Sequence, residues 1–179
     1  MKIVSVCASP RKNGNTEAII RSIGDELKKA GESGGKNRYY SLGSMKISPC
    51  RACLKCVKKG SCVLSDDFEK LSARMLRSDL IILGSPVYFS DVSAQAKAFI
   101  DRTFSLWHRK ALQGKKVILV AACAESGSGH TIDTLRHWAR EHEMEVVATI
   151  TGESEEKGKV MRNENTRGAV SDAVRDLLS

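Results

Sequence analysis

Apolar residues recur along the chain with two different periods, and the two periods alternate. Four short runs are almost wholly apolar, as in strands buried on both faces of a sheet; they are residues 2–7, 80–83, 116–123 and 146–150. Between these runs, apolar residues recur three or four positions apart, as on the buried face of a helix. Residues 38–42 (Arg-Tyr-Tyr-Ser-Leu) are expected to form a further strand.

Helices are expected to begin near residues 15, 66, 93 and 131, and a short helix is expected at 167–178. The glycine-rich turn Gly31–Gly35 is expected to end the first of them. Five strands with intervening helices imply an α/β fold, a doubly wound parallel sheet covered on both faces. Right-handed crossovers and a length of 179 residues favour the flavodoxin-like order 2-1-3-4-5 over a six-stranded Rossmann sheet. We expect a single domain, residues 1–179.

The stretch 43–65 follows neither period and contains four of the six cysteines. A structureless connection of this length is uncommon in a compact domain unless it is functional. The cysteines are spaced C-x2-C-x2-C-x5-C, at Cys50, Cys53, Cys56 and Cys62. We therefore interpret the stretch as a cysteine-rich metal-binding insert after the second strand.

Two kinds of metal centre compete for this spacing. An unbroken C-x2-C-x2-C wraps several corners of an iron–sulfur cube, which needs one thiolate per iron. Structural zinc also takes four thiolates, although its usual framework is two C-x2-C knuckles separated by a longer loop. Disulfides are disfavoured, because the N-terminal apolar run is too short for a secretory signal and a reducing cytoplasm is expected. The spacing favours one 4Fe–4S cluster. Cys7 and Cys123 end predicted strands and are expected to be small core residues.

The loop Ser9–Thr16 joins the first strand to the first helix and has the composition of a phosphate site. A helix N-terminus supplies free N–H groups and a positive dipole. The loop adds hydroxyl and amide donors, basic side chains, and a glycine that lets the backbone approach a ligand. These residues are Ser9, Arg11, Lys12, Gly14, Asn15 and Thr16. An ordinary turn with a capping Asn or Thr is the alternative.

Ligands of such sheets bind beyond the carboxyl ends of the strands, where the winding reverses, here between the first and third strands. The loop that leaves the third strand is Ser85–Ser90. We interpret Pro86–Phe89 as the wall of a flat aromatic ligand, whose polar ring edges meet backbone groups. A bend carrying two core aromatic residues is the alternative.

Composition narrows the range of functions. The net charge of +8 is dispersed, and indicates either a preference for acidic partners or a generally basic surface. With 5% aromatic residues and no recognisable nucleic-acid module, no binding of DNA or RNA is expected. No apolar run is long enough to cross a bilayer, so no membrane association is expected.

Three motifs, Ser9-Pro-Arg-x-Asn-Gly-Asn-Thr16, Ser85-Pro-Val-Tyr-Phe89 and Lys97-Ala-Phe-Ile-Asp-Arg102, resemble the NADPH-dependent FMN reductase family of flavodoxin-like proteins. With the cysteine run added, residues 1–151 resemble the iron–sulfur flavoproteins of anaerobic archaea and bacteria. The resemblance implies FMN, a 4Fe–4S cluster on the four cysteines, and a homodimer or homotetramer.

In that family the flavin phosphate sits on the first loop, and the ring lies along the loop after the third strand. The loop after the fourth strand also approaches the ring, with a weaker match here. The positions implied are Ser9, Arg11, Asn13, Asn15 and Thr16 for the phosphate, Pro86, Val87, Tyr88, Phe89 and Ser90 for the ring, and Ala124, Glu125, Ser126 and Gly127 for the third loop.

The insert leaves the carboxyl end of the second strand, so the cluster is expected over the same sheet edge as the flavin. A cluster passes one electron at a time, and a flavin accepts one or two. We expect a flavin-dependent oxidoreductase that moves electrons from ferredoxin, or a similar one-electron donor, to oxygen, hydrogen peroxide or a quinone. Two alternatives stay open. One is an NAD(P)H-dependent FMN or quinone reductase with structural or zinc-binding cysteines, and the other is an electron carrier without its own substrate.

Overall fold

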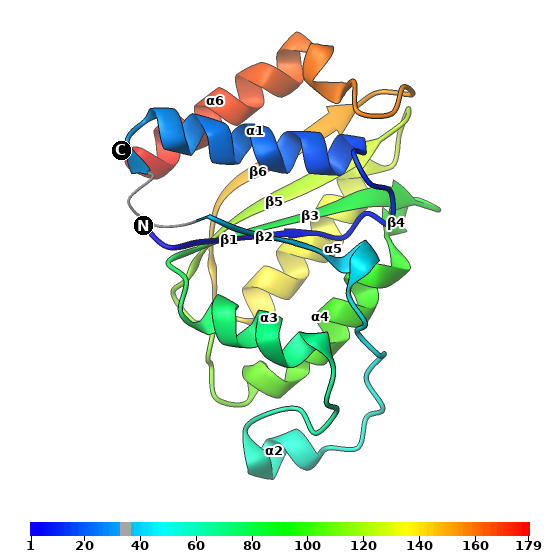
Figure 1. Cartoon of the computed structure of the whole chain (residues 1–179), viewed down its shortest axis with the longest axis vertical. Coiled ribbons are helices and arrows are strands. Elements are labelled where there is room, and N and C mark those ends of the chain that lie inside the picture. The colour runs from blue at the N-terminus through cyan, green and yellow to red at the C-terminus, as the bar shows by residue number, and fades with distance from the viewer. Residues whose placement is uncertain (33–36) are drawn as a thin grey trace.

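A computed structural model describes residues 1–32 and 37–179 as a three-layer α/β domain (Figure 1). Its parallel sheet has the order β2-β1-β3-β5-β6. The strands are β1 (Ile3–Cys7), β2 (Arg38–Ser41), β3 (Leu80–Tyr88), β5 (Lys116–Cys123) and β6 (Glu145–Glu153). A two-residue strand, β4 (Asp91–Val92), pairs antiparallel with the end of β3. Without β4, this order is the predicted 2-1-3-4-5, and the predicted fold class is confirmed.

Helices cover both faces of the sheet (Figure 1). On one face lie α1 (Asn15–Lys29) and α6 (Glu164–Leu178). On the other lie α3 (Asp67–Leu76), α4 (Ala94–Trp107) and α5 (Ser128–Glu141). A five-residue helix, α2 (Lys55–Lys59), hangs below α3 and α4 in the cysteine-rich insert, and two 3-10 turns occupy Leu42–Ser44 and Val160–Arg162.

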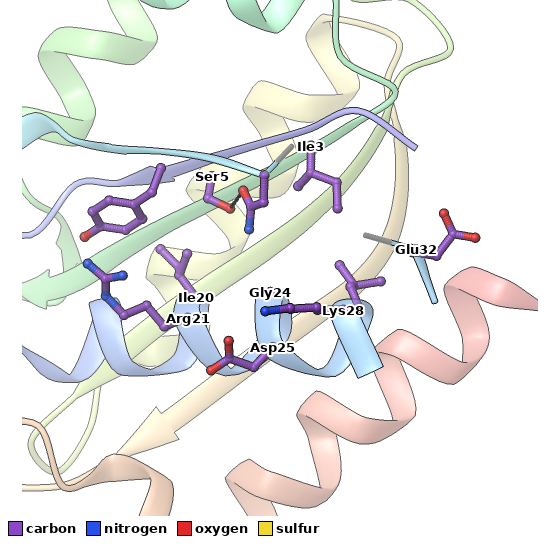
Figure 2. Close-up of a pocket in the computed structure, with 11 residues that line it drawn as sticks. Ile3, Ser5, Ile20, Arg21, Gly24, Asp25, Lys28 and Glu32 are labelled. Atoms are coloured by element: carbon purple, nitrogen blue, oxygen red, sulfur yellow. Dashed lines mark hydrogen bonds between the residues drawn. The ribbon is translucent and has the colours of Figure 1, made fainter. Parts of the chain in front are cut away.

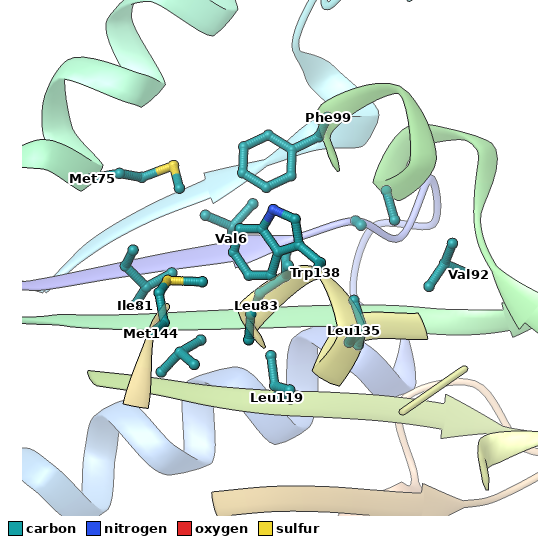
Figure 3. Packing of buried hydrophobic residues seen from close by; sticks show 14 of the residues in the cluster. Val6, Met75, Ile81, Leu83, Val92, Phe99, Leu119, Leu135, Trp138 and Met144 are labelled. Carbon is teal, nitrogen blue, oxygen red and sulfur yellow. The ribbon is translucent and has the colours of Figure 1, made fainter. Parts of the chain in front are cut away.

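The apolar strands supply side chains to two cores, one on each face. In β1, Val4 and Val6 join the core beneath α3, α4 and α5, whereas Ile3 and Cys7 join the core beneath α1 and α6. Alternate residues of a strand point to opposite faces, so a strand covered on both sides must be apolar throughout. Figure 3 shows the first core, where Phe99 and Trp138 meet over the sheet with ring centroids 6.1 Å apart. Cys7 and Cys123 are both buried free thiols, as predicted.

Several elements differ from the sequence prediction: β4 and α2 were not predicted, and β6 extends beyond the predicted 146–150. Strand β3 continues to Tyr88 through the segment predicted as a loop, because Gly84–Pro86 pairs with β5 and Val87–Tyr88 with β4. Helix α6 begins at Glu164 instead of residue 167, with Asn163 as its N-cap. Helix α5 begins at Ser128, since Gly127 adopts a left-handed φ of 89° and starts the helix before the predicted residue 131. The predicted turn Gly31–Gly35 lies mostly outside the described residues.

A hollow of about 390 Å³ lies between α1 and the strands β1 and β2 (Figure 2). Gly24 permits this packing, because a Cβ there would lie 2.7 Å from Nδ2 of Asn37. The hollow is lined by Ile3 and Leu27, at the amino end of β1 and the C-terminal half of α1. It is therefore at the opposite end of the sheet from the carboxyl edge, where ligands of this fold class bind.

Candidate functional site

A cleft of about 260 Å³ opens at the carboxyl edge of the sheet, where the predicted ligand loops come together. Its lining combines residues that follow β1 and β6 with the carboxyl ends of β3 and β5 and the first residue after β5. From the predicted set it includes Ser9, Arg11, Gly14, Asn15, Thr16, Pro86, Val87, Tyr88 and Ala124. The predicted Asn13, Phe89, Ser90, Glu125, Ser126 and Gly127 belong to the same loops but do not line the cleft. The role of all these residues in holding a flavin stays a prediction.

The first loop presents the N-terminus of α1 to this cleft. Within residues 1–32 and 37–179 no side chain caps that terminus, so the amides of the first turn are left for another acceptor. Ser9 is buried and turns its Oγ inward to accept the Arg11 N–H at 3.2 Å. Asn13 has a positive φ of 54°, and its N–H donates to Glu17 at 2.8 Å, which fixes the turn. An open helix N-terminus beside the exposed Arg11 is suited to a phosphate group.

The side chain of Asn15 holds a neighbouring loop in place. Its Nδ2 donates to the carbonyl of Ser154 at 2.9 Å, and its Oδ1 accepts the N–H of Val160 at 3.3 Å. These bonds attach the loop after β6 to the phosphate-type loop, and Ser154, Glu155 and Lys157 complete the cleft lining. Sequence reasoning missed this loop, because a polar stretch without periodicity indicates no more than irregular structure. The signal in the sequence was the pair Lys157-Gly158, a basic residue next to a glycine that can form a tight turn. In the structure Gly158 does turn the chain, with a φ of 73°.

The loops after β3 and β5 touch at Gly127. A Cβ at this glycine would lie 3.0 Å from Cγ1 of Val87 and 3.2 Å from Cα of Ser90, and its φ is 89°. Phe89 and Ser90 also have positive φ values, 53° and 66°. Phe89 is fully exposed, with 108% of its reference surface accessible, so it projects from the rim of the cleft. Tyr88 is also exposed, so the alternative of a bend carrying two core aromatic residues is not what the structure shows.

The four cysteines of the insert line one small pocket of about 30 Å³. The wall opposite them comes from α4 and consists of Asp101, Arg102, Phe104 and Ser105. Among the described residues, no group of three or more His, Cys, Asp or Glu side chains is arranged to hold a single metal ion. In a 4Fe–4S cluster each thiolate binds a different iron, so the four thiols need to surround a common space. The shared pocket fits that requirement.

Electrostatics also indicates that the thiols are close together. The pKa of the Cys56 thiol is raised above its ordinary value, first by burial and then by the negative charges of Cys62, Cys53 and Cys50. The backbone around them turns sharply, with positive φ values at Ala52 and at Leu54, which begins α2. These backbone turns allow all four cysteines to line the same pocket.

A buried ion pair attaches the insert to α4. The guanidinium of Arg102 binds both carboxylate oxygens of Asp66, at 2.6 and 3.0 Å, and donates to the carbonyls of Ser48 and Leu64 at 2.8 and 3.4 Å. Those carbonyls lie two residues from Cys50 and from Cys62 along the chain. Burial acts to raise the pKa of Asp66, but hydrogen bonds from Arg102 and from the Ser48 and Phe68 amides outweigh it and lower that pKa. Asp66 therefore stays ionised and fixes both ends of the cysteine loop.

The cysteine pocket and the carboxyl-edge cleft share no lining residue. The insert leaves the carboxyl end of β2 as expected, but it then runs back along α4. Ala94, the first residue of α4, and Arg102 are eight residues apart, which is about 12 Å along a helix axis. The cysteines thus lie beside the C-terminal half of α4, away from the sheet edge where the cluster was expected.

The comparisons with known proteins agree with the fold and the cleft. The chain belongs to the NADPH-dependent FMN reductase family, whose model matches residues 1–156. It is accordingly a flavin-dependent oxidoreductase, and FMN is the cofactor that the family supports. The open N-terminus of α1 and the loops around it fit that cofactor.

Several similar proteins are named iron–sulfur flavoproteins, the class that the cysteine spacing and the flavin motifs together predict. An iron–sulfur flavoprotein of Methanocaldococcus jannaschii is 35% identical over 149 residues, which are 82% of this chain and 76% of that protein. One of Archaeoglobus fulgidus is 36% identical over 143 residues, 77% of this chain and 64% of that protein. A solved flavodoxin from the domain Archaea superposes with a TM-score of 0.61 at 15% identity and covers 100% of both chains, which supports the fold alone.

In the part of the chain that the structure describes, no helix is both long and apolar enough to cross a bilayer.

Proposed function

We propose that this protein is an iron–sulfur flavoprotein that moves electrons between a one-electron donor and an acceptor through FMN and one 4Fe–4S cluster. The observation that carries the proposal is the common pocket of Cys50, Cys53, Cys56 and Cys62 in a chain that belongs to a flavin reductase family. The names of the archaeal relatives support it. When bound, the cluster supplies one-electron exchange and the flavin supplies one- or two-electron exchange.

The flavin would be held at the carboxyl-edge cleft. The first-turn amides of α1, with Ser9 and Thr16, would bind the phosphate, and Arg11 and Lys157 would balance its charge. The backbone of Pro86–Tyr88 and the loop at Ala124 would face the ring. The cleft offers one anion site, which favours FMN over a dinucleotide.

The donor would be ferredoxin or another small acidic electron carrier. Lys55, Lys58 and Lys59 are exposed on α2, next to Cys53 and Cys56. A cluster of basic residues around the pocket attracts acidic proteins over a distance of about 10 Å at 0.1 M salt. Oxygen, hydrogen peroxide or a quinone would accept the electrons at the flavin, whose rim is exposed around Tyr88 and Phe89.

We also propose that the active form is a homodimer or homotetramer. Phe89 at the cleft rim and Phe104 and Trp107 beside the cysteine pocket are exposed in the single chain. A second copy would cover such side chains and shield one face of the flavin from water. Sedimentation of the loaded protein at micromolar concentration tests this, and a monomer would count against it.

The cluster is tested by replacing the cysteines with serine in protein made anaerobically with iron supplied. Each change at Cys50, Cys53, Cys56 or Cys62 should lower the iron and sulfide content, because only thiolate sulfur binds iron strongly at these positions. The matched controls Cys7→Ser and Cys123→Ser change buried thiols far from the pocket and should leave the content unchanged. Stoichiometric zinc without sulfide in the parent protein would reject the cluster.

The electron path is tested with the same variants. Because separate loops hold FMN, the serine variants should keep their flavin and still be reduced by dithionite. They should lose reduction by ferredoxin. Unchanged ferredoxin-dependent rates would refute the relay even where the cluster is present, and product release only with NAD(P)H would favour a nicotinamide-dependent reductase.

A further inference from the structure

Arg102 places a buried guanidinium in the wall of the cysteine pocket with one donor unused. Its side chain is 0% exposed. Nη1 and Nη2 bind Asp66 and the carbonyls of Ser48 and Leu64. Nε is buried and has no hydrogen-bond partner within residues 1–32 and 37–179. An unpaired buried donor costs about 1–3 kcal/mol, and more when the group is charged, so an acceptor for this N–H is expected.

Besides the cysteines, the pocket offers two side-chain acceptors, and both already have a partner: the Asp101 carboxylate binds Lys97, and the Ser105 hydroxyl bonds to the Arg102 carbonyl. The cysteines are therefore the acceptors still open to Nε. Arg102 lines the pocket together with all four cysteines. A neutral thiol accepts hydrogen bonds weakly, whereas an ionised sulfur is a strong, charge-assisted acceptor. Arg102 therefore gains a strong acceptor for its Nε–H when the sulfur atoms carry negative charge, as they do when they bind metal.

We propose that Arg102 donates its Nε–H to a sulfur of the iron–sulfur centre and thereby raises the reduction potential of that centre. The inference rests on the cluster of the proposed function. An electron that enters the pocket adds one negative charge, and no bond is made or broken. A fixed positive charge and a hydrogen bond to sulfur both stabilise that added charge, and such hydrogen bonds are among the factors that set cluster potentials.

Asp66 should act in the opposite direction. Its carboxylate neutralises much of the charge of Arg102 and holds the guanidinium end-on, so that Nε is left free. Asp66 is a positioning residue in this scheme, because it acts through Arg102, and the pair together sets the potential. A purely structural ion pair would give a different result. Loss of either residue would then loosen the cysteine loop, but loss of Arg102 would not lower the potential while loss of Asp66 raised it.

The test is a redox titration of anaerobically reconstituted protein, monitored by electron paramagnetic resonance, with iron, sulfide and FMN measured on each sample. Arg102→Gln removes the charge and the Nε donor, and should lower the equilibrium constant for one-electron reduction at least ten-fold, which is about 59 mV. Asp66→Asn keeps an N-cap for α3 and should raise the potential. The matched control is Lys29→Gln, which removes an exposed positive charge on α1, outside the cysteine pocket, and should change nothing.

The double variant Asp66→Asn/Arg102→Gln guards against misfolding, because it leaves no unpaired carboxylate. Its equilibrium constant for one-electron reduction should be at least ten-fold lower than that of Asp66→Asn. Full clusters with unchanged potentials in both Arg102 variants would overturn the inference and leave the proposed function standing. Loss of the cluster from both would assign Arg102 to holding the loop, and would also overturn it. A parent protein without iron and sulfide would instead reject the proposed function itself.

Discussion

His142 should make the fold sensitive to mild acid. The side chain is 4% exposed and lies at the end of α5. Its Nε2 is 2.9 Å from Thr103 Oγ1, which also accepts the Trp138 Nε1–H at 2.9 Å. Nδ1 is buried without a partner among the described residues. Burial lowers the pKa of His142 from 6.5 to about 4, with a smaller opposing effect of Glu141. The ring is therefore neutral in the folded protein.

The magnitude follows from the difference between the two pKa values. A change from 6.5 to about 4 corresponds to about 3 kcal/mol, at about 1.4 kcal/mol per unit, as an upper bound. The unfolded chain binds this proton first as the pH falls. The free energy of unfolding should therefore be constant above pH 7, decrease from about pH 6.5, and lose the whole contribution below about pH 4.

The assay is urea unfolding of the parent and of His142→Gln between pH 7 and pH 4.5, in the same cofactor state. The variant is expected to show little of the decrease, whatever its absolute stability, because glutamine does not titrate. The lowered pKa of Asp66 adds its own loss of stability only near and below 3.8, outside this window. Equal pH slopes for the two proteins would refute the reasoning.

The remaining predictions concern the cleft. Asn15→Ala removes both hydrogen bonds to the loop after β6. It should lower the free energy of unfolding by about 1–3 kcal/mol and weaken FMN binding in a fluorescence titration. The control Ser154→Ala keeps the backbone carbonyl that Asn15 binds, so it should change neither quantity. An unchanged FMN affinity would show that the loop after β6 does not contribute to FMN binding. Gly127→Ala forces a Cβ into Val87 at a φ of 89° and should cost about 1–3 kcal/mol. Its control, Gly129→Ala, meets nothing within 4 Å in a helix and should be neutral or stabilising by up to about 1 kcal/mol in the same denaturant titration; equal losses for both would refute the argument from packing at Gly127.

The sheet could be predicted because its signal lies in consecutive residues. A run such as Leu80–Leu83 is apolar at every position, and a strand buried on both faces is what such a run allows. The carboxyl-edge loops followed from the strand order. Pro86–Tyr88 was nevertheless predicted as a loop, because Pro86 pairs with Ala122, which is distant in the sequence, and Val87 and Tyr88 pair with β4, a strand of two residues that is too short to show a period.

The parts that sequence could not supply are set by tertiary contacts. The loop at Ser154–Lys157 enters the cleft through hydrogen bonds from Asn15, more than a hundred residues away. The cysteine spacing indicated a shared centre, but its position beside α4 depends on the ion pair of Asp66 with Arg102. Neither residue differs in the sequence from an ordinary capping aspartate or an exposed arginine.

Helix α4 begins at the carboxyl edge of the sheet and contributes Arg102 to the cysteine pocket. The number of residues between its N-cap and Arg102 therefore matters to both places. Ser93, its N-cap, donates through Oγ to the Ala8 carbonyl at 2.7 Å, and its backbone N–H donates to Ser85 Oγ at 3.0 Å, so the helix start is fixed at the carboxyl edge of the sheet. Arg102 follows at a set angle around the axis. Deletion of one residue between them would rotate Arg102 by about 100° and turn it away from the cysteine loop. Lengthening the loop before Cys50 would leave that angle unchanged, so the insert can vary in length where the helix cannot.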